Sequence, residues 1–313
     1  MIIDSEDVAG RAYEAFGAGN LNEAAGHFAE LLQLVPDNPA YHYMQGLVHK
    51  YLRSWQASLH HNLRSQALRP EPEEASIWNA GIAATALGDW AEARRQWKKC
   101  GLKIQEGEGP IESDFGVASV RLNPWGDGET VFARRIDPVR ARLLNVPLPE
   151  SGYGFFDIVL HDGASTGSRI LDGQEVHVFN VMERLQPSEF KTYTAFVTCE
   201  DPTDLTPLME TRAPGIGYIE DWTGSMVHLC LRCSYGIPHR HAKEAKKKAW
   251  EPARNIGIAA QSRQVVTKIL DRWKGKKRRV DGIESRKFPL SSPSDGVIWW
   301  RFPGEDDEQD EEG

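Results

Sequence analysis

The sequence lacks a long apolar run. None of its 313 residues belongs to a stretch near the roughly 18 apolar residues that a membrane-spanning helix needs, and its first residues have neither the basic start nor the apolar core of a secretory signal. Cysteine is also scarce. Its four positions, Cys100, Cys199, Cys230 and Cys233, are too unevenly spaced for a disulfide framework. These absences predict a cytoplasmic protein without membrane contact.

Recognisable catalytic signatures are missing as well. There is no Gly-x-Ser-x-Gly turn, no phosphate-binding glycine-rich loop with Lys and Ser or Thr, no dinucleotide fingerprint and no His-Glu-x-x-His. Residues 161–165 (His-Asp-Gly-Ala-Ser) combine the residue types of a hydrolase triad. A triad needs members that converge in space, so we interpret this segment as a turn at a strand end. We therefore expect a protein that is not an enzyme.

Charge is present but unevenly distributed. The net charge is −8 at pH 7, and the 40% apolar and 26% charged residues are typical of a soluble globular chain. Residues 240–287 hold 16 Lys or Arg against five Asp or Glu, a net charge of +11, so the other residues carry −19. Residues 305–312 alone contain seven carboxylates. The basic block and the acidic tail could dock onto nucleic acid, onto a protein or onto each other. The same distribution equally suits a solvated lysine-rich helix followed by a disordered tail.

The first hundred residues repeat with a period of about 34 residues. Each copy places small, turn-forming and aromatic residues at matching positions. These are Ala12, Gly19, Leu21, Ala24, Phe28 and Pro36 in the first copy, Gly46, Trp55, Ser58 and Pro70 in the second, and Gly81, Gly88, Trp90, Ala93 and Trp97 in the third. Glycine favours a turn between helices, small residues let paired helices approach closely, and proline ends a helix. The period therefore predicts helical hairpins.

This pattern resembles the tetratricopeptide repeat. The resemblance implies that residues 1–107 form a solenoid of paired helices whose concave face binds peptides or partner proteins. The side chains that would line this groove are Tyr13, Phe16, Tyr43, Leu47, Trp78 and Ile82. The same side chains would equally suit packing between the repeats, and the sequence leaves both roles open.

A change of pattern marks a second, β-rich module, which we place at residues 114–188. Residues 101–113 lose the helical periodicity and gain glycine and charge. Beyond them, five short segments rich in strand-forming residues are bounded by glycine, proline or aspartate, and they cover residues 118–122, 129–133, 140–146, 155–160 and 174–181. Five short strands in about 70 residues predict a small barrel or a strongly curved sheet, with an elaborated open sheet as the alternative.

The third module, residues 189–303, is predicted as an α+β domain. Residues 191–200 alternate like a strand, residues 201–211 begin with the Asp-Pro pair typical of a helix start, and residues 222–232 alternate again. These three segments predict a β-α-β unit. The other predicted elements are a mostly helical segment at 242–275, a last strand at 297–302 and an acidic disordered tail at 304–313.

Residues 228–241 concentrate side chains that bind metals. Cys230 and Cys233 are spaced as a Cys-x-x-Cys knuckle, and His239 and His241 follow a Gly-Ile-Pro turn. Two thiolates and two imidazoles suit a tetrahedral Zn²⁺ ion, and a closed set of four protein ligands is structural. The two pairs are closer together than in most zinc sites, so the same residues could instead be semi-buried structural thiols or a redox-active dithiol.

A basic patch accompanies this stretch. Its members are Lys246, Lys247, Lys248, Lys274, Lys276, Lys277, Arg278 and Arg279. Basic side chains neutralise phosphates, and the nearby Trp250 and Trp273 could stack on bases, so the patch would suit nucleic acid. No RNA-binding signature accompanies it, and tryptophans at this spacing also anchor a helix to its domain.

Taken together, these segments predict an α+β multidomain protein. A helical solenoid similar to tetratricopeptide repeats precedes a β-rich, barrel-like module and a β-α-β unit with a C-terminal helix. This layout is similar to that of repeat-containing immunity proteins of bacterial polymorphic toxin systems. The resemblance implies a non-catalytic protein that neutralises a toxin domain, with its acidic surface facing a basic effector. Two alternatives remain: a zinc-stabilised adaptor that binds a peptide in the repeat groove and RNA or the ribosome through the basic patch, and a metalloenzyme with a Cys/His site.

Overall fold

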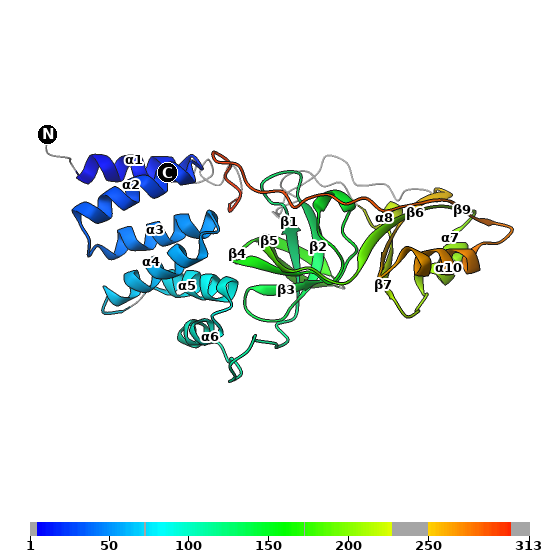
Figure 1. Ribbon diagram of the computed structural model, residues 1–313, viewed down its shortest axis with the longest axis horizontal. Coiled ribbons are helices and arrows are strands. Elements are labelled where there is room, and N and C mark those ends of the chain that lie inside the picture. The colour runs from blue at the N-terminus through cyan, green and yellow to red at the C-terminus, as the bar shows by residue number, and fades with distance from the viewer. Residues whose placement is uncertain (1–4, 72, 172, 227–249, 302–313) are drawn as a thin grey trace.

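Three modules follow one another in the computed structural model, which describes residues 5–71, 73–171, 173–226 and 250–301. Helical repeats lie at one end of an elongated molecule, a closed β-barrel lies in the middle, and a four-stranded α+β domain lies at the other end (Figure 1). The predicted α+β multidomain class is confirmed. In the described ranges, the structure has no helix that is long and apolar enough to cross a membrane.

The N-terminal module consists of helical hairpins. Its described helices pair as α1 (Ser5–Gly17) with α2 (Leu21–Leu34), α3 (Pro39–Tyr51) with α4 (Trp55–Ala67), and α5 (Glu74–Leu87) with α6 (Trp90–Lys99). The turn of each hairpin contains one residue with a left-handed backbone, and φ is 80° at Gly19, 58° at Arg53 and 71° at Gly88. These positions are 34 and 35 residues apart. The predicted hairpins are therefore confirmed, and the second copy makes its turn without glycine.

Glycine also sets the distance between the two helices of a hairpin. An added Cβ at Gly46 would lie 2.5 Å from Nδ2 of Asn62, and one at Gly81 would lie 2.5 Å from the ring of Trp97. Asn62 and Trp97 occupy equivalent places in the second helices, and both are fully buried. A side chain at either glycine would therefore force the helices apart.

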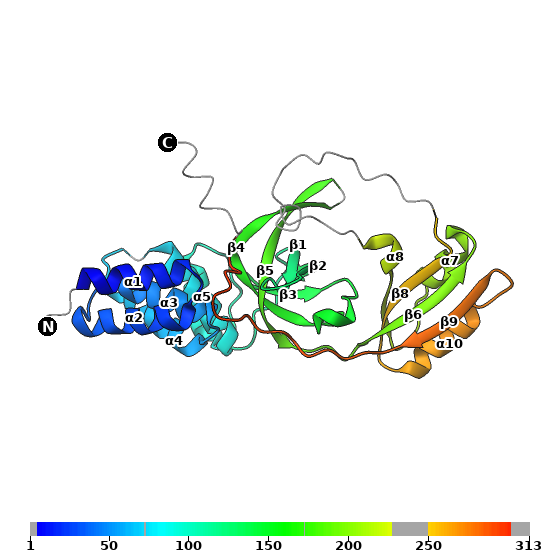
Figure 2. The ribbon, with the colours of Figure 1, turned by 90° about the horizontal axis from the view of Figure 1, so that it is seen from above.

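The middle module is a closed barrel, as predicted. Its strands are β1 (Val117–Leu122), β2 (Glu129–Arg135), β3 (Arg140–Leu143), β4 (Ile158–Leu171) and β5 (Gln174–Gln186). Each strand is antiparallel to the next, and the parallel pairing of Val120 with Phe179 closes the ring. A short 3₁₀ helix, η1 (Pro149–Ser151), precedes β4. The β4–β5 hairpin is longer than predicted and extends beyond the barrel (Figure 2).

The third module contains a four-stranded sheet. Its elements are β6 (Lys191–Cys199), α7 (Pro202–Met209), β7 (Ile216–Asp221), α8 (Trp222–Ser225), β8 (Ala253–Ala260), α10 (Arg263–Trp273) and β9 (Arg278–Glu284). The strand order is β7-β8-β6-β9, and β8 is antiparallel to both β6 and β7. Helix α7 therefore connects β6 to β7, which are parallel and have β8 between them. Helix α10 likewise connects β8 to β9, which are parallel and have β6 between them. This is the split β-α-β arrangement of ferredoxin-like folds.

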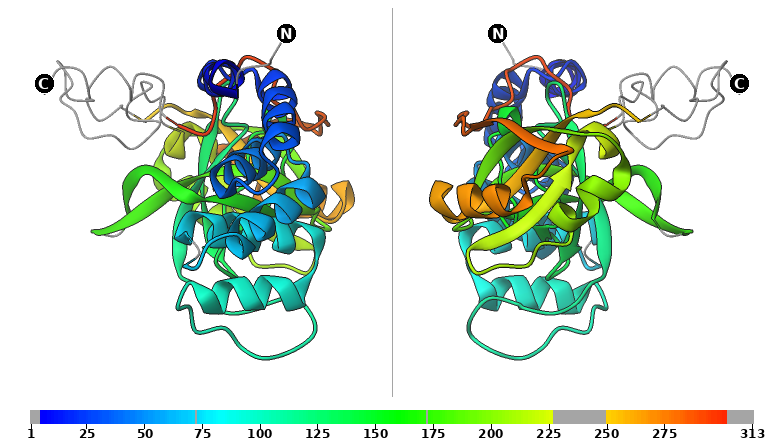
Figure 3. Two further views of the ribbon diagram at one scale, coloured as in Figure 1. Left: turned by 90° about the vertical axis from the view of Figure 1, so that its left-hand side faces the viewer. Right: turned by 90° about the vertical axis from the view of Figure 1, so that its right-hand side faces the viewer.

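One face of this sheet carries α7 and α10, whose apolar side chains form a core with β6 and β8 (Figure 3). Alternate residues of β6, from Tyr193 to Cys199, point into that core. The predicted strand at 191–200 and the helix start are confirmed, and the carboxylate of Asp201 accepts a hydrogen bond from Thr203 N at 2.8 Å.

Three predictions in this module are wrong in the described residues. The second strand of the β-α-β unit is 216–221, and residues 222–225 form a helix instead of starting a strand, because Trp222 turns inward and donates from Nε1 to Val146 O at 2.8 Å. Residues 253–260 form the strand β8, not a helix, since the apolar run at its end, residues 256–260, fits a doubly paired strand as well as a buried helix. Residues 297–301 are not a strand.

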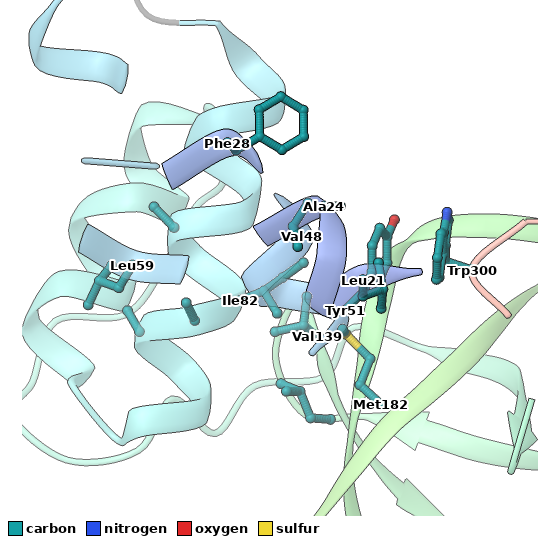
Figure 4. Close-up of a cluster of buried hydrophobic side chains, with 14 of the residues drawn as sticks. Leu21, Ala24, Phe28, Val48, Tyr51, Leu59, Ile82, Val139, Met182 and Trp300 are labelled. Carbon is teal, nitrogen blue, oxygen red and sulfur yellow. The ribbon is translucent and has the colours of Figure 1, made fainter. Parts of the chain in front are cut away.

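Residues 285–301, which we call the strap, return along the barrel to the helical repeats (Figure 1). Gly296 N donates to Gly19 O at 2.9 Å, and Asn180 Nδ2 of the barrel donates to Trp299 O at 2.7 Å. The ring of Trp300 stacks on Tyr51 of α3, with 4.5 Å between the ring centroids. Figure 4 shows that Tyr51 and Trp300 belong to one core with Val139 and Met182 of the barrel module.

The barrel also joins the third module through the loop at residues 145–148. Glu220 of β7 accepts a hydrogen bond from Val146 N at 2.9 Å, and both carboxyl oxygens of Glu129 in β2 lie 3.1 Å from Leu148 N. Burial raises the pKa of Glu129 to about 8, so this carboxyl is largely protonated near neutral pH. The loop is thus held from both sides.

The repeat packing can be tested with a matched pair of glycines. We expect Gly81→Ala to lower the free energy of unfolding by about 1–3 kcal/mol, because the added methyl group meets the buried ring of Trp97. Gly26→Ala in α2 has no atom within 4 Å of the added methyl group, so it should raise the free energy of unfolding by up to about 1 kcal/mol. Urea unfolding measures both, and equal stability of the two variants would contradict the packing.

Candidate functional site

The predicted zinc site lies outside the described residues. Cys230, Cys233, His239 and His241 fall within 227–249, as do Lys246, Lys247 and Lys248 of the basic patch. The Zn²⁺ site therefore stays a prediction from the sequence. Within the part of the chain that the structure describes, no group of three or more His, Cys, Asp or Glu side chains is arranged to hold a metal ion.

Three of the predicted groove residues contact other modules of the chain. Phe16 stacks on Trp300 of the strap at 5.4 Å between ring centroids. An added Cβ at Gly163 of β4 would lie 3.0 Å from the ring of Trp78 and 3.8 Å from the side chain of Ile82. Much of the predicted partner groove is thus occupied by the chain's own barrel and strap.

The other three groove residues differ in exposure. Tyr43 is half-buried, and burial raises the pKa of its hydroxyl, with nearby Glu73 and Asp162 adding to the effect. Leu47 packs partly buried against the repeat core. Tyr13 is 45% exposed, with its ring edge-on to Phe28. Of the six, Tyr13 is the one that still presents a large surface for a partner.

A buried ion pair lies where the repeats meet the barrel. Lys50 Nζ of α3 is 3.0 Å from Asp162 Oδ1 of β4, and the two side chains are only 5% and 4% exposed. The ammonium group also lies 4.4 Å from the ring centroid of Tyr51. Burial and the neighbouring Asp162 raise the pKa of Tyr51 well above its usual value, so its hydroxyl stays protonated.

The segment 161–165 is not the strand-end turn that we expected. It lies inside β4, where the pairing with β5 shifts register, and its Asp162 side chain reaches Lys50 of the repeats. His161 is fully buried, its Nδ1 lies 2.7 Å from Asp162 O, and its ring stacks on Phe179. Burial lowers the pKa of His161 to about 4, so the ring is neutral. Within the segment, Asp162 contacts Lys50 of the repeats. His161 is fully buried and Ser165 is exposed, and the Ser165 hydroxyl donates to Gly167 O at 2.8 Å instead of to the histidine, so the segment does not form the hydrogen-bonded arrangement of a hydrolase triad.

A second group of titratable side chains lies between α3 and α4. Nε2 of His42 lies 2.9 Å from Pro36 O, and since a carbonyl only accepts, Nε2 carries the proton. Nδ1 of His42 then accepts from Nδ1 of His61 at 3.0 Å, and His49 stacks on His61. Burial is the main reason that the pKa values of all three are lowered, that of His61 to about 4. The cluster is therefore neutral in the folded protein.

The described part of the basic patch is largely paired with carboxylates. Lys274 lies 2.7 Å from Asp271, Lys277 lies 2.8 Å from Glu200, and Arg279 pairs with Asp281. Arg278 lies over the ring of Trp273, 5.9 Å from its centroid. Lys276 is exposed. These contacts hold β9 and its approach against α10 and β6, and they reduce the positive charge that the patch offers to phosphates.

The first hairpin presents an acidic surface that sequence reasoning did not single out. Over residues 5–37 there are six carboxylates against one basic side chain, Arg11. Most of them are exposed, and the exposed ones are Glu6, Asp7, Glu14, Glu23 and Asp37; Asp7 pairs with Arg11, and Asp37 lies 2.5 Å from Arg64 of α4. Leu34 and Val35 are 42% and 39% exposed beside them. A charge count over residues 5–37 alone would have shown this surface, whereas the count over the whole chain averages it with the basic block at residues 240–287.

Comparison with known proteins places the chain in no family: no family model matches it, and neither does any curated protein. The tetratricopeptide and immunity-protein resemblances therefore stay predictions.

The histidine cluster predicts a loss of stability at mildly acidic pH. His42, His49 and His61 are neutral when folded and take up protons on unfolding, so their contribution is complete above about pH 6.5 and is lost as the pH falls towards 4. Because the rings of His49 and His61 are only partly buried, we expect a loss of about 1 kcal/mol between pH 7 and pH 5, measured by urea unfolding.

His61→Gln should reduce this pH-dependent loss, because it removes the most strongly shifted ring of the cluster. His27→Gln is the matched control, since His27 lies in α2 outside the cluster. An equal loss in wild type and His61→Gln would show that the cluster is not its source.

Proposed function

We propose that this chain is a non-catalytic binding protein of the cytosol, an immunity protein that neutralises a bacterial toxin domain by direct contact. The observation that carries the proposal is the acidic surface of the first hairpin, with Tyr13, Leu34 and Val35 exposed among its carboxylates. Exposed apolar side chains within a field of one sign are suited to a partner of opposite charge. A toxin that acts on nucleic acid has such a basic surface.

The rigid connection between the modules supports this function. Apart from the strap, Trp55 Nε1 of α4 donates to Glu183 Oε2 of β5 at 2.6 Å, and Arg140 of β3 lies over the ring of Trp90 in α6 at 4.6 Å. A surface held in place before binding loses less conformational entropy when the partner docks. The hairpin is therefore presented as part of one scaffold.

The strongly shifted titratable groups also favour binding over catalysis. His161 is fully buried with its ring stacked on Phe179, His61 is paired with His42, and Glu129 holds the loop at residues 145–148. A general acid or base must reach a substrate, and these groups are engaged in contacts within the fold. Their pKa shifts follow from burial in structural contacts.

An adaptor that binds RNA through the basic patch is the competing proposal. The ion pairs of Lys274, Lys277 and Arg279 count against it, since each neutralises a charge that phosphate binding needs. RNA that co-purifies in a salt-sensitive manner would favour the adaptor.

Co-expression with a candidate toxin domain from a neighbouring gene tests the proposal. We expect a stable complex and rescue of growth, and reversal of two acidic side chains, Glu14→Lys with Glu23→Lys, should raise the Kd at least about tenfold. Glu108→Lys with Glu210→Lys is the control, because it changes the net charge equally at exposed sites elsewhere. No complex and no rescue would contradict the proposed function, and equal weakening by both pairs would contradict the acidic surface as the site.

A further inference from the structure

A pocket of about 470 Å³ opens where the barrel passes into the third module. Its walls come from three barrel strands and from the chain that leads to β6. The lining residues are Arg142, Phe156, Ile158, Gln186, Pro187, Ser188, Glu189 and Phe190. The pocket therefore belongs to a junction that the contacts of the loop at residues 145–148 hold rigid.

Phe156 has an unusual backbone. Its φ is 68°, a left-handed conformation that bulky L-residues rarely adopt. Hydrogen bonds on either side impose it: Phe156 N donates to Leu143 O at 3.1 Å, and the carboxylate of Asp157 accepts from Gly154 N at 2.9 Å and from Ser188 N at 2.8 Å. The ring is 40% exposed. Glycine would make the same turn without strain, so the position favours a role for the ring itself.

The exposed ring is the end of an aromatic stack. Phe155 stacks on Phe156 at 4.1 Å between centroids and on Tyr218 of β7 at 5.7 Å. Phe190 meets both phenylalanines edge-on. Because Phe155 is only 5% exposed, the stack is anchored in the fold while its outer ring faces solvent.

The cation of the pocket is Arg142. Its guanidinium lies 5.8 Å from the centroid of the Phe156 ring. Among the residues that the structure describes, no carboxylate, carbonyl or hydroxyl pairs with the Arg142 side chain. A guanidinium offers a planar fork of donors that matches a carboxylate. An apolar ring and an unpaired cation therefore face the same space.

We propose that this pocket binds a segment of a partner protein in which an aromatic side chain stands next to a carboxylate. The aromatic ring packs against Phe156 and Phe190, and the carboxylate pairs with Arg142. Small-molecule sites enclose most of the ligand surface, whereas Phe156, Gln186, Pro187 and Glu189 leave this pocket open. Such a pocket suits a side chain that the rest of an interface holds in place. Aromatic and arginine side chains are also the residue types that dominate binding energy at interfaces.

One carboxylate of the pocket wall, Glu189, opposes the binding of an acidic segment. This exposed carboxylate lies on the pocket wall and repels the carboxylate of the bound segment. Glu189→Gln should therefore strengthen binding, whereas Arg142→Gln should weaken it. The proposal does not depend on the partner being a toxin.

Three blocked peptides test the proposal by NMR titration of the full chain. Acetyl-Gly-Phe-Glu-Gly-amide should shift the signals of Phe156 and Arg142 with a Kd of about 1 mM. The versions with Gln for Glu and with Ala for Phe should each bind at least about fivefold more weakly, because one lacks the carboxylate and the other lacks the ring. Binding of the first peptide should also be lost in Arg142→Gln and in Phe156→Gly.

Phe156→Gly is chosen because glycine accepts the left-handed backbone, so its melting temperature should stay within about 2 °C of wild type. If Phe156→Gly is less stable than wild type, Arg142→Gln still tests the proposal, because a partly exposed arginine side chain can be replaced with little effect on the fold. No binding of the first peptide at about 10 mM, equal binding of the Gln version, or undiminished binding to Arg142→Gln would each overturn the proposal. These measurements use no toxin, so they are separate from the test of the proposed function.

Discussion

The buried pair of Lys50 and Asp162 is the constraint on which the arrangement of the modules depends. An ammonium and a carboxylate removed from water need each other, and loss of one partner typically costs about 3–5 kcal/mol. Any hinge movement between α3 and β4 would separate the two charges or let water reach them. The tryptophans of the strap close the same junction, since Trp299 is fully buried and Trp300 stacks on Tyr51 beside the lysine. The repeats and the barrel consequently share one core.

This constraint changes where a partner can bind. The resemblance to tetratricopeptide repeats predicts a concave groove, but Phe16, Trp78 and Ile82 contact the chain's own strap and barrel. The two proposed partner surfaces are on the outside of the described part of the chain: the acidic first hairpin at one end and the pocket of Arg142 and Phe156 at the junction of barrel and third module. The first is rich in carboxylates, whereas the second places a guanidinium beside aromatic rings, so they select partner surfaces of different chemistry.

Local patterns in the sequence predicted the parts of the fold that local physics determines. The hairpins followed from small contact residues and, in the first and third copies, from glycine turns, and the helix start at Pro202 followed from the capping residue Asp201. The strand at 253–260 was missed because its apolar run, residues 256–260, has no period that separates a strand from a helix. The contact between Lys50 and Asp162 spans 112 positions, and no local pattern reports such a contact. Phe156 was missed for a related reason: its left-handed backbone is imposed by Leu143 and Asp157, against the preference of the residue itself.

Native-state hydrogen exchange tests most directly the claim that repeats and barrel form one cooperative unit. The informative amides are those of Val48 in α3, Ile82 in α5 and Leu160 in β4, which are all fully or almost fully buried. If the modules share a core, these amides exchange with one common free energy of opening, and Asp162→Ala lowers it for all three together. Exchange of Val48 and Ile82 at a clearly lower free energy than Leu160 would show that the repeats open independently, and it would contradict the account.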